Sequence, residues 1–268
     1  MTDLLQPLTF LGDQVRFQAK AIAKVPTAVR RHHREVLSLV ALVSFGRGAM
    51  AMIGGTVVTV GFLTAFTGVE LGIQGYTQLS DIGVSVLSGF VSAYINTRLA
   101  APFMAGIALI ATVGAGFTAQ LGAMRVSEEI DALESMGVPS MGYLVSTRIV
   151  AGLLAIVPLY AIGLVASYLG TRLVVTLVYG QSAGTYDHYF YAFLSNRDIL
   201  YSFVEVAVGA VVIMGIHCYY GYNATGGPAG VGRAVGRAVR LSLIAVLFID
   251  LLLSLALYGS AHTVHISG

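Results

Sequence analysis

Long apolar runs, separated by short polar segments, dominate this sequence. A run of about 20 apolar residues is long enough to cross a ~30 Å hydrocarbon layer as a helix. The runs predict membrane-spanning helices at about residues 49–79, 82–124, 142–178, 199–220 and 238–260. We therefore predict an all-α fold, a polytopic integral membrane protein with five transmembrane helices.

The second run is longer than one membrane crossing requires. Residues 82–124 are apolar except at Asn96, Thr97 and Arg98, so they could form one long, disturbed helix or two short spans. Short cytoplasmic loops collect Lys and Arg. Five spans place the basic N-terminal segment, the loop after the second span and the basic loop before the last span in the cytoplasm, whereas six would put both loops outside. The charge pattern therefore favours one long helix, disturbed near Arg98.

The N-terminal segment, residues 1–48, has a pattern of its own. Arg16, Lys20 and Lys24 recur every four residues beside a broken apolar side, which is typical of a helix lying in the membrane interface. The alternative is a partly ordered cytoplasmic tail. We expect the interfacial helix, followed by one membrane domain at residues 49–268. The charges place the N-terminus in the cytoplasm and the C-terminus, whose tail lacks Lys and Arg, in the periplasm.

The composition supports a membrane protein and argues against several activities. Charged residues make up 10% and hydrophobic residues 56% of the 268 positions, whereas soluble domains carry about a quarter charged residues. A single cysteine, Cys218, excludes an internal disulfide. The sequence has no GxxxxGK[ST] phosphate loop, no HExxH and no paired CxxC. We expect no cofactor or metal in this chain, no nucleic-acid partner and no catalytic activity.

An acidic stretch, GAMRVSEEIDALESMG at residues 122–137, contrasts with the rest of the chain. It predicts a short helix between the second and third spans, with Ser127 as the N-cap and Gly137 as the stop. Ile130 and Leu133 fall on one face of this helix. The carboxylates of the stretch are Glu128, Glu129, Asp131 and Glu134. Two interpretations stay open: a solvated loop helix, or a docking helix for a cytoplasmic partner.

Several stretches carry a more specific pattern. GAGFTAQLGAMRVSEEIDALESMG at 114–137 and YLVSTR at 143–148 closely resemble the signature of the MlaE/YrbE family, the permease subunits of ABC transporters that move lipids with MCE-domain proteins. LGIQGY at 71–76 and GYNATGGPAGVGRAVGRAV at 221–239 are similar to further family motifs. The resemblance implies that the acidic helix is a coupling helix in a groove of a cytoplasmic ATPase. The implied coupling residues are Ser127, Glu128, Glu129, Ile130, Asp131, Leu133 and Glu134.

Some positions depart from the family pattern. The family often has Arg-Glu-Leu-Gly-Pro where this chain has RLAAP at residues 98–102. Thr112 stands at a usually basic position, and Thr147 replaces a proline. Paired permeases of actinobacterial Mce systems, as in mycobacteria, are two different YrbE chains, and this sequence is more similar to the B-type chain. The resemblance therefore implies a heterodimer with a second YrbE-type permease.

The same resemblance implies the remaining partners and the activity. A cytoplasmic ATPase dimer would bind ATP and Mg²⁺, and MCE-domain proteins would lie on the outer side of a bacterial inner membrane. The transporter would move lipid or fatty acid, with import as the expected direction. The alternative is a self-contained secondary transporter with an ion or proton relay through Arg98, Glu205 and Asp250. Such transporters usually contain internal repeats, and this sequence shows none, which favours the ABC permease.

Ionisable residues within the spans are candidates for the lipid path. A charge at membrane depth is costly unless it faces a partner or a water-filled cavity. Arg98 fits either a substrate cavity or a structural ion pair, while Glu205 and Asp250 fit structural roles better. Glu70 lies near the outer boundary of the first span. The lipid-path candidates are Glu70, Arg98 and Glu205.

Small residues and arginines complete the set of candidates. Gly68 and Gly72 have the GxxxG spacing that permits close helix packing in membranes. Gly114 and Gly116 lie in a GxGxxA pattern, but within a helix, so we expect packing there and not nucleotide binding. At the cytoplasmic edge of the last span, arginines on one helix face are suited to anchoring lipid headgroups or contacting the ATPase. These are Arg233, Arg237 and Arg240.

Overall fold

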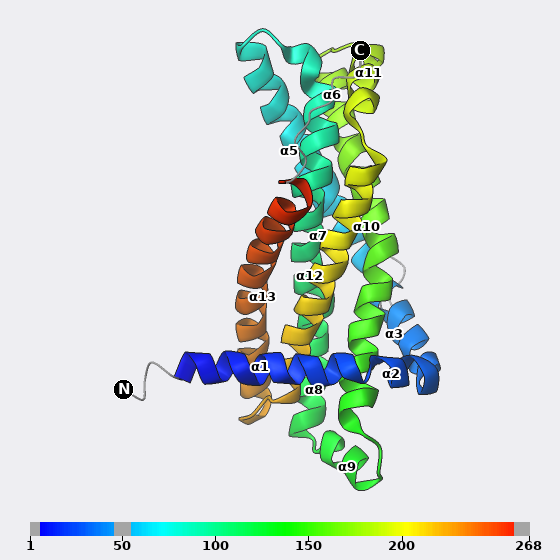
Figure 1. Ribbon diagram of the computed structural model, residues 1–268, viewed down its shortest axis with the longest axis vertical. Coiled ribbons are helices and arrows are strands. Elements are labelled where there is room, and N and C mark those ends of the chain that lie inside the picture. Colours follow the sequence, from blue (N-terminus) through cyan, green and yellow to red (C-terminus); the bar gives the residue numbers. More distant parts are fainter. Residues whose placement is uncertain (1–5, 46–54, 260–268) are drawn as a thin grey trace. The chain divides into compact units, whose positions relative to one another are not determined.

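The structure is a computed structural model that describes residues 6–45 and 55–259, and within these ranges it contains helices and connections but no strand (Figure 1). Among the described residues, five helical runs are long and apolar enough to cross a membrane. They are Gly55–Asp81, Ser85–Val126, Met141–Val178, Asn196–Tyr222 and Gly227–Tyr258. The predicted all-α fold with five spans is confirmed. The domain boundary expected after residue 48 and the C-terminal tail lie outside the described residues.

The described helices include three that precede the first span: α1 (Gln6–Ala23), α2 (Val25–Arg31) and α3 (His33–Phe45). The first span is α5 (Gly55–Asp81), and the second comprises η1 (Ser85–Leu87), α6 (Ser88–Val91), η2 (Ser92–Ala100), α7 (Ala101–Leu109), η3 (Ile110–Gly114) and α8 (Ala115–Val126). The third comprises η4 (Met141–Ser146), α10 (Thr147–Leu173) and η5 (Val174–Val178). The fourth and fifth are α12 (Asn196–Tyr222) and α13 (Gly227–Tyr258), and the short helices between spans are α9 (Glu129–Ser135) and α11 (Ala183–Phe193).

The second span is one long run that is interrupted by two π-helical segments. The first, η2, contains Arg98, and the second, η3, contains Thr112. Pro102 is the second residue of α7, just after η2; it lacks an N–H, and its ring crowds the carbonyl four residues earlier, which disfavours a regular α-helical turn there. The prediction of a single long helix, disturbed near Arg98, is confirmed.

The chain forms two compact units. Unit 1 takes its described residues from 1–56, 109–156 and 210–245, and unit 2 from 57–108, 157–209 and 246–268. The helices α10, α12 and α13 each contribute residues to both units. The acidic loop helix α9 belongs to unit 1, whereas Arg98 and Glu205 belong to unit 2.

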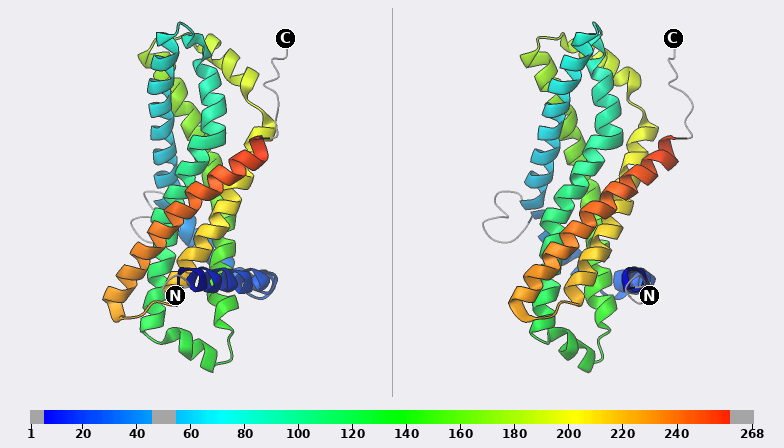
Figure 2. Two further views of the ribbon diagram at one scale, coloured as in Figure 1. Left: turned by 60° about the vertical axis from the view of Figure 1, so that its left-hand side comes forward. Right: turned by 90° about the vertical axis from the view of Figure 1, so that its left-hand side faces the viewer.

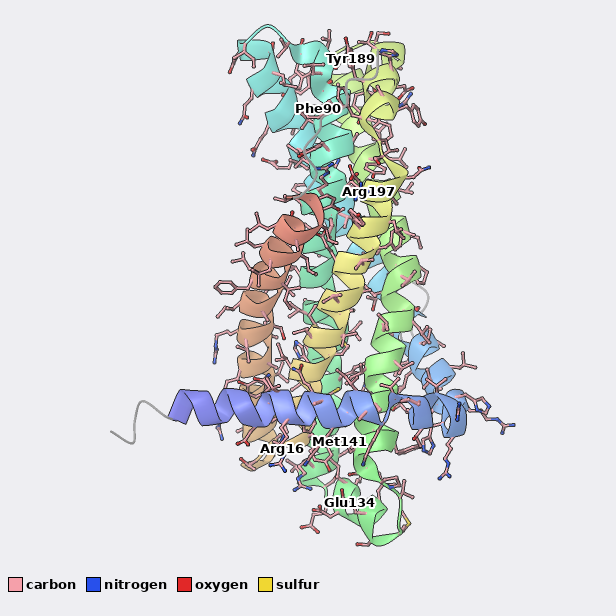
Figure 3. All side chains as sticks on the ribbon, in the orientation of Figure 1. Arg16, Phe90, Glu134, Met141, Tyr189 and Arg197 are labelled. Atoms are coloured by element: carbon pink, nitrogen blue, oxygen red, sulfur yellow. The ribbon has the colours of Figure 1, made fainter. Side chains whose placement is uncertain are left out.

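In unit 1, α1 runs across the long helices and not along them (Figure 1), and a quarter turn shows it nearly end-on (Figure 2). Phe17 on its buried face meets Tyr219 edge-on, with ring centroids 5.3 Å apart. Ala21 accepts a hydrogen bond from Ser146 Oγ at 2.8 Å. Arg16, labelled in Figure 3, and Lys20 are both exposed. The helix therefore packs one face on protein and leaves basic residues open, and its place in the membrane interface stays a prediction.

The two glycines of the GxGxxA pattern differ in their surroundings. Gly114 lies against the ring of buried His217, because an added Cβ would be 2.6 Å from His217 Cδ2. The same ring is held by Thr118, whose hydroxyl is 2.7 Å from His217 Nδ1. At Gly116 an added Cβ would meet nothing within 4 Å among the described residues. Gly116 therefore makes no close packing contact there, and its packing against another chain stays a prediction.

In unit 2, buried polar side chains connect α5, η2 and α10. Asn96 Nδ2 donates to Thr171 Oγ1 at 2.9 Å, and Asn96 Oδ1 accepts from Ser167 Oγ at 2.7 Å. Thr171 Oγ1 also donates to the Gly68 carbonyl at 2.7 Å. An added Cβ at Gly68 would collide with the backbone of Ser167, and one at Gly72 would be 3.2 Å from the Thr171 carbonyl oxygen. These glycines allow α5 to approach α10 closely.

Candidate functional site

The acidic helix α9 begins later than expected. Ser127 is the C-cap of α8, and its hydroxyl donates to the Ala123 carbonyl at 2.9 Å and to Glu129 Oε1 at 2.9 Å. Glu128 then adopts a left-handed conformation with φ 61° and turns the chain into α9. The prediction of Ser127 as an N-cap is wrong. The physical reason is that α8 continues to Val126, so the serine bonds backwards to the preceding turn.

One part of the apolar face of α9 packs within the chain, and the rest is exposed. Ile130 is fully buried within unit 1, so it anchors α9 to its own chain. This corrects the expectation that Ile130 fills a groove on a partner. Leu133 is half-buried, and Met136, directly after the helix, is 70% exposed. Met136 was missed because an amphipathic pattern shows which face is apolar but not what covers it.

Glu134 ties this loop to the end of the fourth span. Glu134 lies on this loop (Figure 3). Its Oε1 accepts hydrogen bonds from Ser140 Oγ and, at 3.2 Å, from Tyr222 Oη, and these two hydroxyls are 2.8 Å apart. The hydrogen bond from Ser140, with a smaller one from Tyr222, lowers the pKa of Glu134 below its ordinary value, because both donors favour the ionised form. The three residues therefore join α9, η4 and α12.

The other acids of the loop lie on its solvent-exposed surface. Asp131 pairs with Arg125 at 2.7 Å, but both side chains are more than a third exposed, so this pair adds little stability. Glu128 and Glu129 are exposed. The loop is fixed to its own chain at Ile130 and Glu134, while its other acids and Met136 are exposed to solvent. A protein that displaced this loop would therefore also move the helices that the loop joins.

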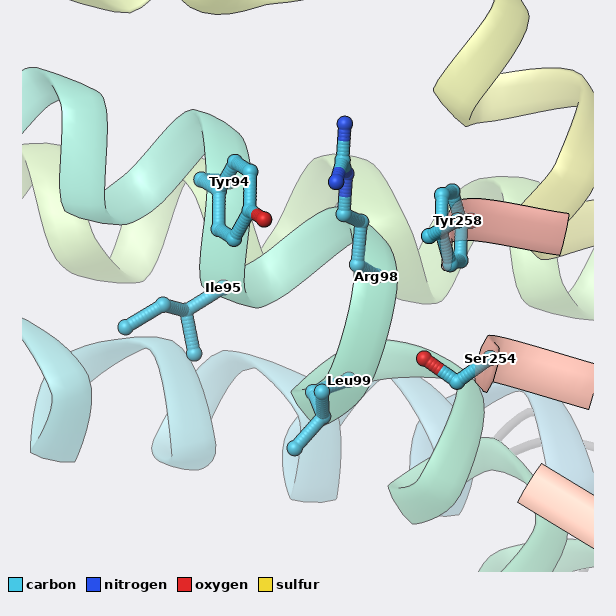
Figure 4. Close-up of a pocket in the computed structure, with 6 residues that line it drawn as sticks. All are labelled: Tyr94, Ile95, Arg98, Leu99, Ser254 and Tyr258. Carbon is cyan, nitrogen blue, oxygen red and sulfur yellow. The ribbon is translucent and has the colours of Figure 1, made fainter. Parts of the chain in front are cut away.

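A second candidate site lies in unit 2 around Arg98 (Figure 4). The guanidinium donates from Nε and Nη2 to Asp198 Oδ2, at 3.1 and 2.8 Å. It lies between the rings of Tyr94 and Tyr258, with its Cζ 4.1 and 4.5 Å from the two centroids. A mainly apolar pocket of about 290 Å³ opens beside it. Its lining residues are Tyr94, Ile95, Arg98, Leu99, Ser254 and Tyr258.

The structure separates the lipid-path candidates. Arg98 is both a member of an ion pair and part of a pocket wall. The ion pair that was expected is present, and a role of the pocket in binding substrate stays a prediction. Glu205 is buried, does not line this pocket, and neither of its carboxylate oxygens has a hydrogen-bond partner among the described residues. Glu70 is bonded to Gln74 Nε2 at 2.5 Å and lies outside the pocket. Asp198 was missed because it directly precedes the predicted start of the fourth span and read as a loop residue.

The remaining polar groups do not gather into a metal site. Within the described residues, no group of three or more His, Cys, Asp or Glu side chains has the geometry to hold a metal ion. The only cysteine, Cys218, is buried. Among the described residues, the two features that could serve a function are the exposed acids and Met136 of the α9 loop and the largely apolar pocket beside Arg98.

Comparison with known proteins identifies the family. A family model described as Permease MlaE matches residues 45–256. The chain belongs to the MlaE permease family. A probable ABC transporter permease of Rickettsia bellii is 32% identical to it over 195 residues, which cover 73% of this chain and 75% of that protein. The intermembrane phospholipid transport system permease MlaE of Haemophilus influenzae is 26% identical over 200 residues, 73% and 75% of the two chains.

A plant relative extends this similarity. The chloroplastic protein TRIGALACTOSYLDIACYLGLYCEROL 1 of Arabidopsis thaliana is 29% identical over 191 residues, 71% of this chain and 55% of that protein. Both the α9 loop and the Arg98 pocket lie inside the stretch that the MlaE permease family shares, except for the last pocket residue, Tyr258.

Proposed function

We propose that this MlaE-family chain is the membrane-spanning subunit of an ABC-type lipid transporter and that a separate cytoplasmic ATPase hydrolyses ATP with Mg²⁺. The names of its relatives, an ABC transporter permease and a phospholipid transport permease, support this proposal. The observation that carries it is the α9 loop. This loop is fixed to its own chain by Ile130 and Glu134 while it exposes Glu128, Glu129 and Met136.

The loop suggests how nucleotide-driven motion reaches the spans. A partner that holds Met136 and the exposed acids would move α9 as a rigid piece, because Ile130 is buried and cannot slip. The Glu134 carboxylate would transmit the displacement to the end of α12 through Tyr222 and to η4 through Ser140. A short helix of this length has little stability of its own, so these contacts decide whether it behaves as a lever or a loose loop.

The Arg98 pocket suggests where cargo contacts the chain. Its walls are mainly apolar, and Arg98 is the cation that lines it, held in place by Asp198 and two tyrosine rings. This combination suits an amphiphile with an anionic head, such as a fatty acid or a phospholipid. Because Asp198 already balances the charge, binding would depend on apolar contact first and on the guanidinium second.

The second permease, the MCE-domain proteins and the orientation of the chain are proposed from the resemblance to the MlaE/YrbE family. We propose a heterodimer with a second YrbE-type permease, since this chain has Leu99 and Thr112 where the family often has an acid and a base. MCE-domain proteins would act on the outer side of a bacterial inner membrane, with the α9 loop inside and import as the direction of transport. Basic residues in the N-terminal helices, among them Arg16 and Lys20, support this orientation.

Co-purification tests the proposed function. The chain is tagged and purified from its native membrane, and the ATPase that comes with it is identified and quantified. Met136→Asp should release the ATPase, because it places a charge in an apolar contact. Ile82→Asp is the matched control, since Ile82 is 72% exposed against 70% for Met136 but lies in the connection after the first span. No ATPase with the unaltered chain, or equal amounts with both variants, would contradict the proposal.

A further inference from the structure

The first turns of α13 carry a row of arginines with no ion partner among the described residues. Arg233, Arg237 and Arg240 recur at spacings of four and three, so they share one face of the helix, and all are exposed. Between them runs a shallow groove of about 480 Å³ within unit 1. Its lining residues are Ala229, Gly232, Arg233, Gly236, Arg237 and Arg240.

The floor of this groove is made of glycines that the chain itself does not require. Among the described residues, an added Cβ at Gly232 would meet nothing within 4 Å, and one at Gly236 would meet only Arg240 Nη1 at 3.8 Å. Neither position has a left-handed backbone, and glycine weakens a helix relative to alanine. The small residues therefore keep space free beside the guanidinium groups, where a group from outside the chain can approach the helix backbone.

An exposed apolar strip continues from the arginines along the same face. The apolar run of α13 begins at Leu241, one residue after Arg240. Leu243 and Ile244, three and four residues beyond Arg240, are 39% and 55% exposed. Arginines directly before an apolar span lie at the depth of lipid headgroups. The face thus offers cations at headgroup depth and, below them, a surface for an acyl chain.

We propose that this groove binds the headgroup of an anionic phospholipid of the surrounding leaflet. Guanidinium groups bind phosphate oxygens in pairs of parallel hydrogen bonds, and several such groups around a small-residue floor fit one phosphate diester. A lipid is favoured over an acidic protein surface because the arginines continue directly into an exposed apolar strip that a soluble partner could not cover. This site is separate from the cargo path and does not depend on the proposed transport function.

Lipid retention tests the site. The full chain is reconstituted in nanodiscs of phosphatidylcholine with or without phosphatidylglycerol, extracted gently, and its bound lipids are counted by native mass spectrometry. The unaltered chain should retain phosphatidylglycerol in preference to phosphatidylcholine, and inorganic phosphate should not displace it. Each of Arg233→Gln, Arg237→Gln and Arg240→Gln should lower retention by about fivefold.

Two further variants separate the groove from general charge. Gly232→Leu with Gly236→Leu fills the floor but keeps every arginine, and it should also abolish selective retention. The matched control, Arg197→Gln, removes the same single charge from an exposed position at the start of α12 and should leave retention unchanged. Circular dichroism verifies that all variants stay helical. Equal retention of both lipids, equal loss in the control, or full retention in the leucine variant overturns the proposal. It is also overturned if the arginine variants keep phosphatidylglycerol but, when purified from the native membrane, lose a protein that co-purifies with the unaltered chain.

Discussion

The hydroxyl of Tyr222 donates a hydrogen bond to the carboxylate of Glu134 across 3.2 Å, and 88 positions of sequence separate the two residues. Through this bond the loop between the second and third spans is connected to the end of the fourth. Ser140 completes the link, since its Oγ is 2.8 Å from the Tyr222 hydroxyl and also donates to Glu134. The loop helix α9 is therefore part of the framework of unit 1 and not a free surface segment.

This link should weaken in acid. Hydrogen bonds from Ser140 and Tyr222 lower the pKa of Glu134 in the folded chain. The stabilisation is present above the ordinary glutamate pKa of 4.5 and is lost as the pH falls through the lowered value. A spin label on Ser135→Cys should therefore become mobile as the pH falls through the lowered pKa of Glu134. With Glu134→Gln added, the label should be mobile at neutral pH and insensitive to acid; a pH response identical to that of the parent would refute the role of Glu134.

The ion pair of Arg98 with Asp198 should stabilise unit 2 more than a similar pair at the surface. Its side chains are only 18% and 13% exposed, so Arg98→Gln leaves a largely enclosed carboxylate unpaired and should cost about 3 kcal/mol of unfolding free energy. Adding Asp198→Asn should recover most of that loss. Arg172→Gln is the matched control, because Arg172 and Asp187 are 39% and 36% exposed and such pairs contribute about 0–1 kcal/mol. Thermal unfolding in detergent gives the comparison, and equal losses at both arginines would show that the Arg98 pair is effectively solvated.

Two neighbouring glycines should respond oppositely to the same substitution. Gly114→Ala would drive a methyl group into the His217 ring, 2.6 Å from Cδ2, and overpacking of this kind costs about 1–3 kcal/mol. Gly116→Ala meets nothing within 4 Å and should be neutral or stabilising by up to about 1 kcal/mol through helix propensity. Unfolding midpoints of the two variants measure this difference. His217→Ala should rescue Gly114→Ala; if it does not, the ring is not the obstacle.

The orientation of the chain can be checked with single cysteines. The native Cys218 is buried and should not react with an impermeant thiol reagent in intact cells. A cysteine at Ser135 in α9 should be protected, whereas one at exposed Ser182, between the third span and α11, should be labelled from outside. Both positions should react once the membrane is permeabilised. Labelling of Ser135→Cys in sealed cells would invert the proposed topology.

The sequence predicts the spans well because hydropathy and length report directly on membrane crossing. The disturbance near Arg98 is also predictable, since a polar tripeptide and Pro102 interrupt an apolar run. The ion partner of Arg98 cannot be predicted from the sequence, because Asp198 lies 100 positions away and only packing brings the two residues together.

At the α9 loop, too, the sequence predicts the local structure but not the contacts that fix it. Its composition predicts a short helix, but the left-handed turn falls on Glu128, a residue type that gives no signal for that conformation. Its apolar stripe predicts burial of Ile130 without showing that the chain itself provides the cover. The link of Glu134 to Ser140 and Tyr222 depends on where three separate helices end, which local patterns do not specify.

We propose that α9 transmits the motion of an ATPase to the spans through Glu134 and Tyr222. The most direct test measures ATP hydrolysis and lipid transfer together, in vesicles that contain the complete transporter with Glu134→Gln and Tyr222→Phe. Arg172→Gln, which removes an exposed ion pair with Asp187 in unit 2, serves as the control. We predict that the double variant keeps its ATPase and hydrolyses ATP but transfers severalfold less lipid per ATP, while the control behaves as the unaltered chain. Unchanged lipid transfer per ATP in the double variant would contradict the account.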